Sequence, residues 1–128
     1  MLTIKNLING QSVEPIAVNY LDNINPATGE VYARIPDSDE RDVDAATAAA
    51  NAAFPAWSTT PKEKRSAALL KLSSLIEKNL DKLALAETND QGKPLWLSKS
   101  VDIPRAVSNF HFYATAALHT HTEAHAME

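Results

Sequence analysis

The chain has 128 residues, of which 45% are hydrophobic and 22% are charged, a balance typical of a globular protein. Sixteen acidic residues against 12 basic ones give a formal charge of -4, and without a dense basic run a nucleic-acid partner is not expected. Cysteine is absent, which excludes disulfides, zinc–thiolate sites and a thiol nucleophile within these residues. The sequence starts without the regions of a signal peptide and has no run of about 18 apolar residues, so we expect a cytoplasmic protein that does not enter a membrane.

Residues 1–36 predict two short β-hairpins. In the segment "LINGQSV", Asn9-Gly10 supplies the positive φ angles that a type I′ turn requires. The run Asn-Pro-Ala-Thr-Gly at 25–29 has turn chemistry, and it leads into "EVYARI", which alternates as a half-buried strand does. Two hairpins of this size do not form a self-sufficient sheet in water, so we expect further structure to complete them.

A first helical block is expected from about residue 38. Asp37 and Ser38 can cap it, and the acidic residues that follow suit its first turn. Small and apolar residues then recur at helical spacing, which indicates close packing on a neighbour: Val43, Ala46, Ala50, Ala53 and Phe54. We expect Pro55 to end this helix, because proline breaks a helix interior.

The second helical block begins with a stronger signal. Thr60 at the N-cap, Pro61 at N1 and Glu63 at N3 form a capping box, and leucines follow at helical spacing. The pattern predicts one long helix or two helices broken near Asn79. It stops at Gly92-Lys93-Pro94, where a left-handed glycine and a proline form a C-terminal signal.

The third block, from about Leu95 to Leu118, contains a proline followed by an arginine. If Asp102 caps this helix, Pro104 lies at N2 and Arg105 at N3, beside N–H groups that have no helical partner. The macrodipole disfavours a cation there by roughly 0.3–1 kcal/mol, so the placement favours a site at which an anion meets the guanidinium and these N–H groups. The alternative is an ordinary surface arginine, or one paired with Asp102.

Asp90 presents the opposite charge at the opposite end of a helix. The dipole disfavours a carboxylate in a last helical turn, and a bound cation would remove that penalty. The alternative is that Asp90 pairs with Lys93 or caps the turn at Gly92.

The C-terminal stretch 119–128 is rich in possible metal ligands: His119, His121, Glu123, His125 and Glu128. His121 and His125 would share one face of a helix, a spacing that can chelate zinc. No third ligand has a fixed geometry, however, and chain termini are commonly mobile. We therefore expect a mobile, solvated tail over these residues in preference to a metal site.

Four stretches closely resemble, in order and spacing, the N-terminal region of the NAD(P)-dependent aldehyde dehydrogenase superfamily. They are "INGQSVE", "NINPATGEVYARIPDSDERDVDAATAAANAAFPAWS", "LLKLSSLIEKNLDKLALAETNDQGKPL" and "SVDIPRAVSNFHFYA". The resemblance spans roughly residues 6–115, and its last stretch is most similar to the 2-hydroxymuconic and 2-aminomuconic semialdehyde dehydrogenases. It implies the α/β fold of that family, with residues 1–128 as a mostly helical N-terminal part of the cofactor-binding domain and helices at about 38–118.

The family's catalytic groups lie far downstream of these stretches. They are a cysteine nucleophile, a glutamate base and an asparagine that holds the oxyanion, and most contacts to NAD also lie downstream. This sequence has no cysteine, and its glycines, Gly10, Gly29 and Gly92, form no G-x-G-x-x-G turn. The resemblance thus implies a homo-oligomeric parent enzyme that oxidises a small aldehyde with NAD(P), and a chain that is inactive by itself.

The resemblance also implies roles for particular residues. Arg105 matches the position that holds the substrate carboxylate in the semialdehyde subgroup, and Val101 matches a position on the pocket wall. Asp90, with the backbone carbonyls of Asn23 and Ile24, matches the site of a monovalent cation, for which oxygen ligands of this kind are suited.

Two other interpretations stay open from the sequence. Within the family, the substrate could be an aldehyde of the betaine or succinic semialdehyde type. Outside the enzymes, the chain could be a non-catalytic helical interaction module, or a truncated product that associates with a full-length partner or with itself through uncovered apolar surface.

Overall fold

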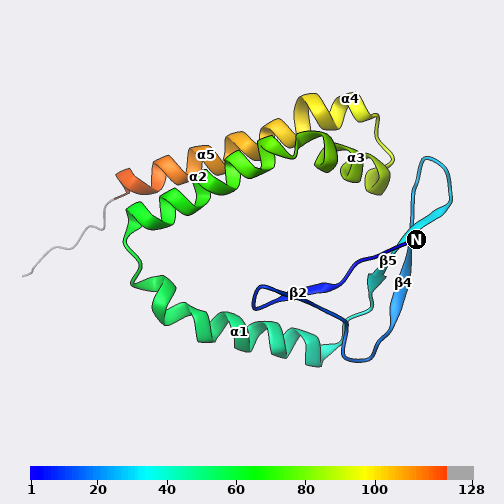
Figure 1. Cartoon of the computed structure of the whole chain (residues 1–128), viewed down its shortest axis with the longest axis horizontal. Helices are drawn as coiled ribbons and strands as arrows, with labels where there is room; N and C mark the ends of the chain where they lie inside the picture. Colours follow the sequence, from blue (N-terminus) through cyan, green and yellow to red (C-terminus); the bar gives the residue numbers. More distant parts are fainter. Residues whose placement is uncertain (121–128) are drawn as a thin grey trace, which may run out of the picture. The chain divides into compact units, whose positions relative to one another are not determined.

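The computed structural model describes residues 1–120 (Figure 1). The chain divides into two compact units, the first formed by Met1–Thr59 with Leu85–Leu95, and the second by Thr60–Ala84 with the chain from Trp96 onward. Two boundaries, after Ala84 and after Leu95, fall inside helices, where the composition of the sequence does not change. This division is therefore not visible in the sequence.

Both predicted hairpins are present in the first unit. Its five strands are β1 (Leu2–Thr3), β2 (Asn6–Ile8), β3 (Gln11–Val13), β4 (Tyr20–Ile24) and β5 (Val31–Pro36). Asn9 and Gly10 join β2 to β3 with φ values of 51° and 72°, as the type I′ turn predicts. β4 pairs antiparallel with β5, and β1 adds a parallel edge to β5, so that the order is β1-β5-β4. This third strand was not predicted, because two residues are too few to show a period.

Helix α1 (Glu40–Ser58) differs from the prediction at both ends. Its N-cap is Asp39 and not Asp37 or Ser38, and Asp39 forms a capping box with Asp42. The expected stop at Pro55 is wrong, since the helix continues to Ser58. Pro55 lies in the last turn, and its carbonyl accepts the hydroxyl groups of Ser58 and Thr59, each at 3.1 Å, which satisfies a carbonyl at the helix end.

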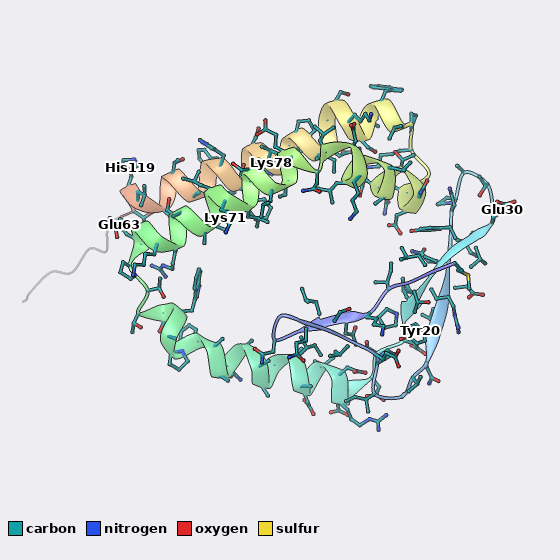
Figure 2. The ribbon with its side chains drawn as sticks, viewed as in Figure 1. Tyr20, Glu30, Glu63, Lys71, Lys78 and His119 are labelled. Carbon is teal, nitrogen blue, oxygen red and sulfur yellow. The ribbon has the colours of Figure 1, made fainter. Side chains whose placement is uncertain are left out.

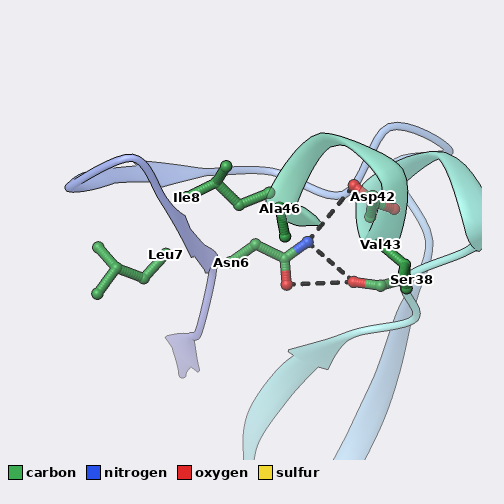
Figure 3. Close-up of a pocket in the computed structure, with 7 residues that line it drawn as sticks. All are labelled: Asn6, Leu7, Ile8, Ser38, Asp42, Val43 and Ala46. Atoms are coloured by element: carbon green, nitrogen blue, oxygen red, sulfur yellow. Dashed lines mark hydrogen bonds between the residues drawn. The ribbon is translucent and has the colours of Figure 1, made fainter. Parts of the chain in front are cut away.

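Asp42 ties the first hairpin to the start of α1 (Figure 3). It is only 4% exposed, and its Oδ1 accepts the N–H of Ile16 at 3.1 Å and, at 3.5 Å, a weaker contact from the amide of Asn6. The same Asn6 side chain exchanges hydrogen bonds of 2.8 and 3.1 Å with Ser38. A hollow of about 190 Å³ opens beside this cluster, against Leu7, Ile8 and α1. Because its polar groups already bond one another, we interpret the cluster as structural.

The second unit is built on two helices that pack side by side, α2 (Lys62–Lys78) and α5 (Ile103–His119). α2 begins one residue later than predicted, with Pro61 in the N-cap position in place of Thr60. Ser73, 4% exposed, donates its hydroxyl to the carbonyl of Val107 at 3.0 Å, and Lys62 donates to the carbonyl of Leu118 at 2.7 Å. These two bonds join the helices at their middle and at one end.

A break after α2 separates it from α3 (Leu80–Gln91), as predicted near Asn79. The third block is α4 (Leu95–Leu97), a π-helical segment η1 (Ser98–Asp102) and then α5. α5 ends at His119, labelled in Figure 2, so the expected tail does not begin at that residue. His121, Glu123, His125 and Glu128 lie outside the described residues. Within residues 1–120 no three His, Asp or Glu side chains form a possible metal cluster, and no helix is long and apolar enough to cross a membrane.

The apolar residues that this chain buries are small. Among the described residues they are Ala33, Ala84, Ala114 and Pro15. Large apolar side chains stay accessible, including Phe54 (64%) and Trp57 (50%) at the end of α1. The small residues of α1 therefore do not produce the close packing that their spacing predicts.

The capping of α1 predicts a pH dependence. The hydrogen bond from Arg41 to Asp39, 2.6 Å long, holds the pKa of that carboxyl below its usual value. Stabilisation from a lowered folded pKa is present above the unfolded pKa of about 3.9 and is lost as the pH falls through the folded value. We expect the urea midpoint of the wild-type chain to fall more steeply below about pH 4 than that of Asp39→Asn, which keeps a cap acceptor but does not titrate. Parallel pH profiles would contradict this account.

Candidate functional site

Asp90, in the last turn of α3, is the centre of a hydrogen-bonded cluster in the first unit. Its Oδ1 accepts the Asn23 amide at 2.9 Å and the Tyr32 hydroxyl at 2.8 Å, and its Oδ2 accepts the Gln91 amide at 2.8 Å. Asn23 and Tyr32 come from β4 and β5, so the second hairpin and the end of α3 meet at one carboxylate. The structure thus brings together Asn23 and Asp90, two of the three residues of the expected cation site. Ile24, the third, follows Asn23 on β4 at a β-bulge and is 51% exposed.

The chemistry of the three groups fixes where the protons lie. A carboxylate only accepts hydrogen bonds, so the Tyr32 hydroxyl and the Asn23 amide must both donate to Asp90. The hydroxyl has a single hydrogen, and its oxygen therefore accepts the second contact of the ring, from the Asn23 nitrogen at 3.0 Å. The amide of Asn23 consequently presents its NH₂ group, and not its oxygen, to the cluster.

The cluster shifts the protonation equilibria of both its acids. Hydrogen bonds from Asn23, Tyr32 and Gln91 lower the pKa of Asp90. Burial of Tyr32 and its hydrogen bond to Asp90 raise the pKa of the phenol. Near neutral pH the pair is an ionised carboxylate and a protonated phenol. The Lys93 ammonium lies 2.7 Å from Glu87.

Gly92 brings the 25–29 turn against the end of α3. It ends the helix with φ of 70°, and its N–H donates to the carbonyl of Thr88 at 2.9 Å, as the sequence signal predicts. A Cβ at this position would lie 3.1 Å from both the backbone nitrogen of Ala27 and the Cβ of Pro26. The turn in "NPATGE" and the helix end in "NDQGKP" are therefore in direct contact. Glycine is required here for its backbone conformation and also for the space.

Arg105 lies on α5 in the second unit, and its surroundings correct one expectation. α5 begins at Ile103 with Asp102 in the N-cap position and Pro104 at N1/N2, as expected, but it continues without a break from the π-helical segment, and Asp102 makes no side-chain cap. Leu97, Asp102 and Ile103 all have right-handed helical angles, and the N–H of Ile103 bonds to the carbonyl of Ser98 within the π-helical segment. We expected the unbonded N–H groups of a new helix end next to the guanidinium. The continuous helix does not provide such an end.

The Arg105 side chain is nevertheless available for a ligand. It is exposed, and it forms no ion pair with any residue that the structure describes, so the expected alternative of a pair with Asp102 is not observed. Val101, in the π-helical segment, is 44% exposed. The two residues stay candidates for substrate contacts.

Sequence reasoning missed two members of the Asp90 cluster. Tyr32 occupies an outward position of an alternating strand, where a tyrosine does not indicate a functional role. Gln91 is an ordinary helix former. A partner for Asp90 could be sought only after the hairpin had been placed beside α3.

Comparison with known proteins establishes the family. The model of the aldehyde dehydrogenase family matches residues 13–128. The chain belongs to the aldehyde dehydrogenase family. Its relatives include the 2-aminomuconic semialdehyde dehydrogenase of Bos taurus, 43% identical over 128 residues, which are 100% of this chain and 26% of that protein. A long-chain-aldehyde dehydrogenase of an Acinetobacter species is 41% identical over 110 residues, 86% of this chain and 22% of that protein.

Solved structures support the same assignment. The structure of an indole-3-acetaldehyde dehydrogenase complexed with NAD⁺ matches with a TM-score of 0.94 and 29% identity, covering 100% of this chain and 26% of that one. The chain is an N-terminal region of this family and spans about a quarter of the length of its relatives. The resemblance of the sequence to this family, and to its muconic semialdehyde members, is confirmed.

Gly92, at the end of α3, and Gly29, in the turn between β4 and β5, allow a matched test. Gly92→Ala should destabilise the chain more than Gly29→Ala, since both have positive φ (70° and 74°) but a Cβ meets nothing within 4 Å at Gly29. An L-residue in this region costs about 1–2 kcal/mol, and the crowding at residue 92 should add about 1 kcal/mol or more. Urea unfolding measures both losses. Equal losses would show that the turn does not pack on α3 as described.

Proposed function

We propose that this chain is the N-terminal segment of an NAD-dependent dehydrogenase that oxidises carboxylate-bearing aldehydes of the muconic semialdehyde type. In such an enzyme a cysteine thiolate would add to the aldehyde, bound NAD would serve as the hydride acceptor, and water would hydrolyse the resulting thioester to the acid and return the thiol. None of these reacting groups is in this sequence, which has no cysteine. They would come from further polypeptide of the parent enzyme, and residues 1–128 would be part of its cofactor-binding domain.

Arg105, which is exposed and forms no ion pair within residues 1–120, carries the substrate assignment. Overall identity does not decide it, because the relatives named for 2-aminomuconic semialdehyde and for long-chain aldehydes are 43% and 41% identical to this chain. A fixed positive charge does distinguish these classes, since a semialdehyde acid offers a carboxylate that a guanidinium can hold with two parallel hydrogen bonds. Beyond its aldehyde group, a long-chain aldehyde offers only hydrocarbon. Val101, on the preceding helical turns, would line the apolar side of the same entrance.

The role of Arg105 can be tested in a chimera in which this chain replaces the matching segment of the bovine relative. We expect Arg105→Ala to raise KM about 10- to 100-fold for a carboxylate-bearing semialdehyde, since a hydrogen bond to a charged group contributes about 1.5–3 kcal/mol. KM for an uncharged aldehyde of similar length should change little. The control is Lys99→Ala, which removes another cation from the same helical block, one that pairs with Asp81 at 2.7 Å. Equal rises in KM for both aldehydes would remove Arg105 from substrate binding.

A second candidate function rests on the uncovered apolar surface. Val43, Phe54 and Trp57 on α1 are each at least half exposed, at 60%, 64% and 50%. Exposed apolar residues of this size favour association, so the chain could act as a non-catalytic module that binds a full-length partner or a second copy.

One preparation of the purified chain addresses both candidates. We expect no NADH to form with any aldehyde above a control without protein, because the thiol nucleophile is absent. Light scattering after size exclusion then reports the mass in solution. A compact monomer at all concentrations would count against the interaction module, whereas NADH formation by the chain alone would overturn the primary proposal.

A further inference from the structure

The environment of Asp90 does not match what a bound cation requires. An alkali cation is held by oxygen atoms that direct lone pairs at it. Here three hydrogen-bond donors point at the carboxylate: the amides of Asn23 and Gln91 and the hydroxyl of Tyr32, all within 2.9 Å of its oxygens. Two of them share Oδ1.

The orientation of these donors cannot be reversed independently. If Asn23 turned its amide oxygen toward Asp90, that oxygen would face a carboxylate oxygen at 2.9 Å, and the amide NH₂ group would no longer donate to the Tyr32 oxygen. The Tyr32 hydrogen is already committed to Asp90, so the hydroxyl could not restore the bond. The three hydrogen bonds among Asn23, Tyr32 and Asp90 can therefore form together in only one orientation of the donors.

We propose that in this chain the Asp90 carboxylate is held by the side chains of Asn23, Tyr32 and Gln91 in place of a monovalent cation. The three donors compensate the negative charge at the end of α3 and keep the hairpin of β4 and β5 against that helix. Tyr32, on β5, determines the orientation of the Asn23 amide. Its single hydrogen is donated to Asp90, so its oxygen can only accept a hydrogen bond from Asn23. The close contact of Gly92 with Pro26 and Ala27 completes this junction without an ion.

The proposal has a direct consequence for ion dependence. A cation that binds only the folded chain raises the melting temperature with its concentration by mass action. We expect the full chain to melt at the same temperature in choline chloride, NaCl and KCl of equal ionic strength. A saturable rise in KCl or NaCl over choline chloride, absent in Asp90→Asn, would overturn the proposal.

A binding measurement that does not depend on unfolding complements this comparison. The sodium NMR line width should be the same in solutions of the wild-type chain and of Asp90→Asn. Broadening by the wild type that Asp90→Asn removes would show a sodium site at Asp90 and would also overturn the proposal.

Tyr32→Phe tests the donor itself. It should lower the melting temperature by roughly 5 °C, equally in choline chloride and KCl, because a hydrogen bond to a charged group is lost. The matched control is Tyr113→Phe, the same change at a side chain 65% exposed on α5, which should have no effect. A Tyr32→Phe variant as stable as the wild type would remove Tyr32 from the junction. If the variant does not fold, the salt comparison and the sodium line width of the wild type still decide the matter.

Discussion

The carboxylate of Asp90 is the constraint on which the first unit depends. It is the point at which β4, β5 and the end of α3 meet, and two of the donors that reach it lie 58 and 67 residues away in sequence. A charge in a last helical turn is unfavourable, so each donor that approaches it gains more than a bond between neutral groups would. Gly92 supplies the space for that approach, and the 25–29 turn fills it.

The second unit is organised differently, by backbone carbonyls that accept side-chain donors. Ser73 and Lys62 on α2 each reach a carbonyl of α5, and the buried residues between the helices are small. Each unit leaves some of its large apolar residues exposed, such as Phe54 in the first and Phe112 in the second. Both therefore resemble parts of a larger structure more than self-contained domains, which is consistent with the quarter of the relatives' length that the chain spans.

Local signals predicted much of this fold, and contacts between distant segments could not be predicted. Asn9-Gly10 specified its hairpin and Gly92 its helix end because a positive φ is a local requirement. The stop expected at Pro55 was wrong, because a proline in a last turn does not have to end a helix, whereas Pro104 lies in the first turn of α5, as its predicted N2 position requires. At the candidate sites, the sequence identified Asp90 and Arg105 as charges in unusual positions. It could not show Tyr32 and Gln91 beside the first, or the helical turns preceding the second.

The π-helical segment before Pro104 has a geometric effect beyond accommodating the proline. A π turn adds a residue to a helix without ending it, and here the hydroxyl of Ser100 donates to the carbonyl of Trp96, one turn earlier, at 2.7 Å. Each residue of an α-helix turns the chain by about 100°. The extra residue therefore rotates the side chains that follow it about the helix axis, relative to the side chains that precede it. Removing a single residue from Ser98–Asp102 would restore a regular helix and would point Arg105 in another direction relative to Trp96, with every side chain still present.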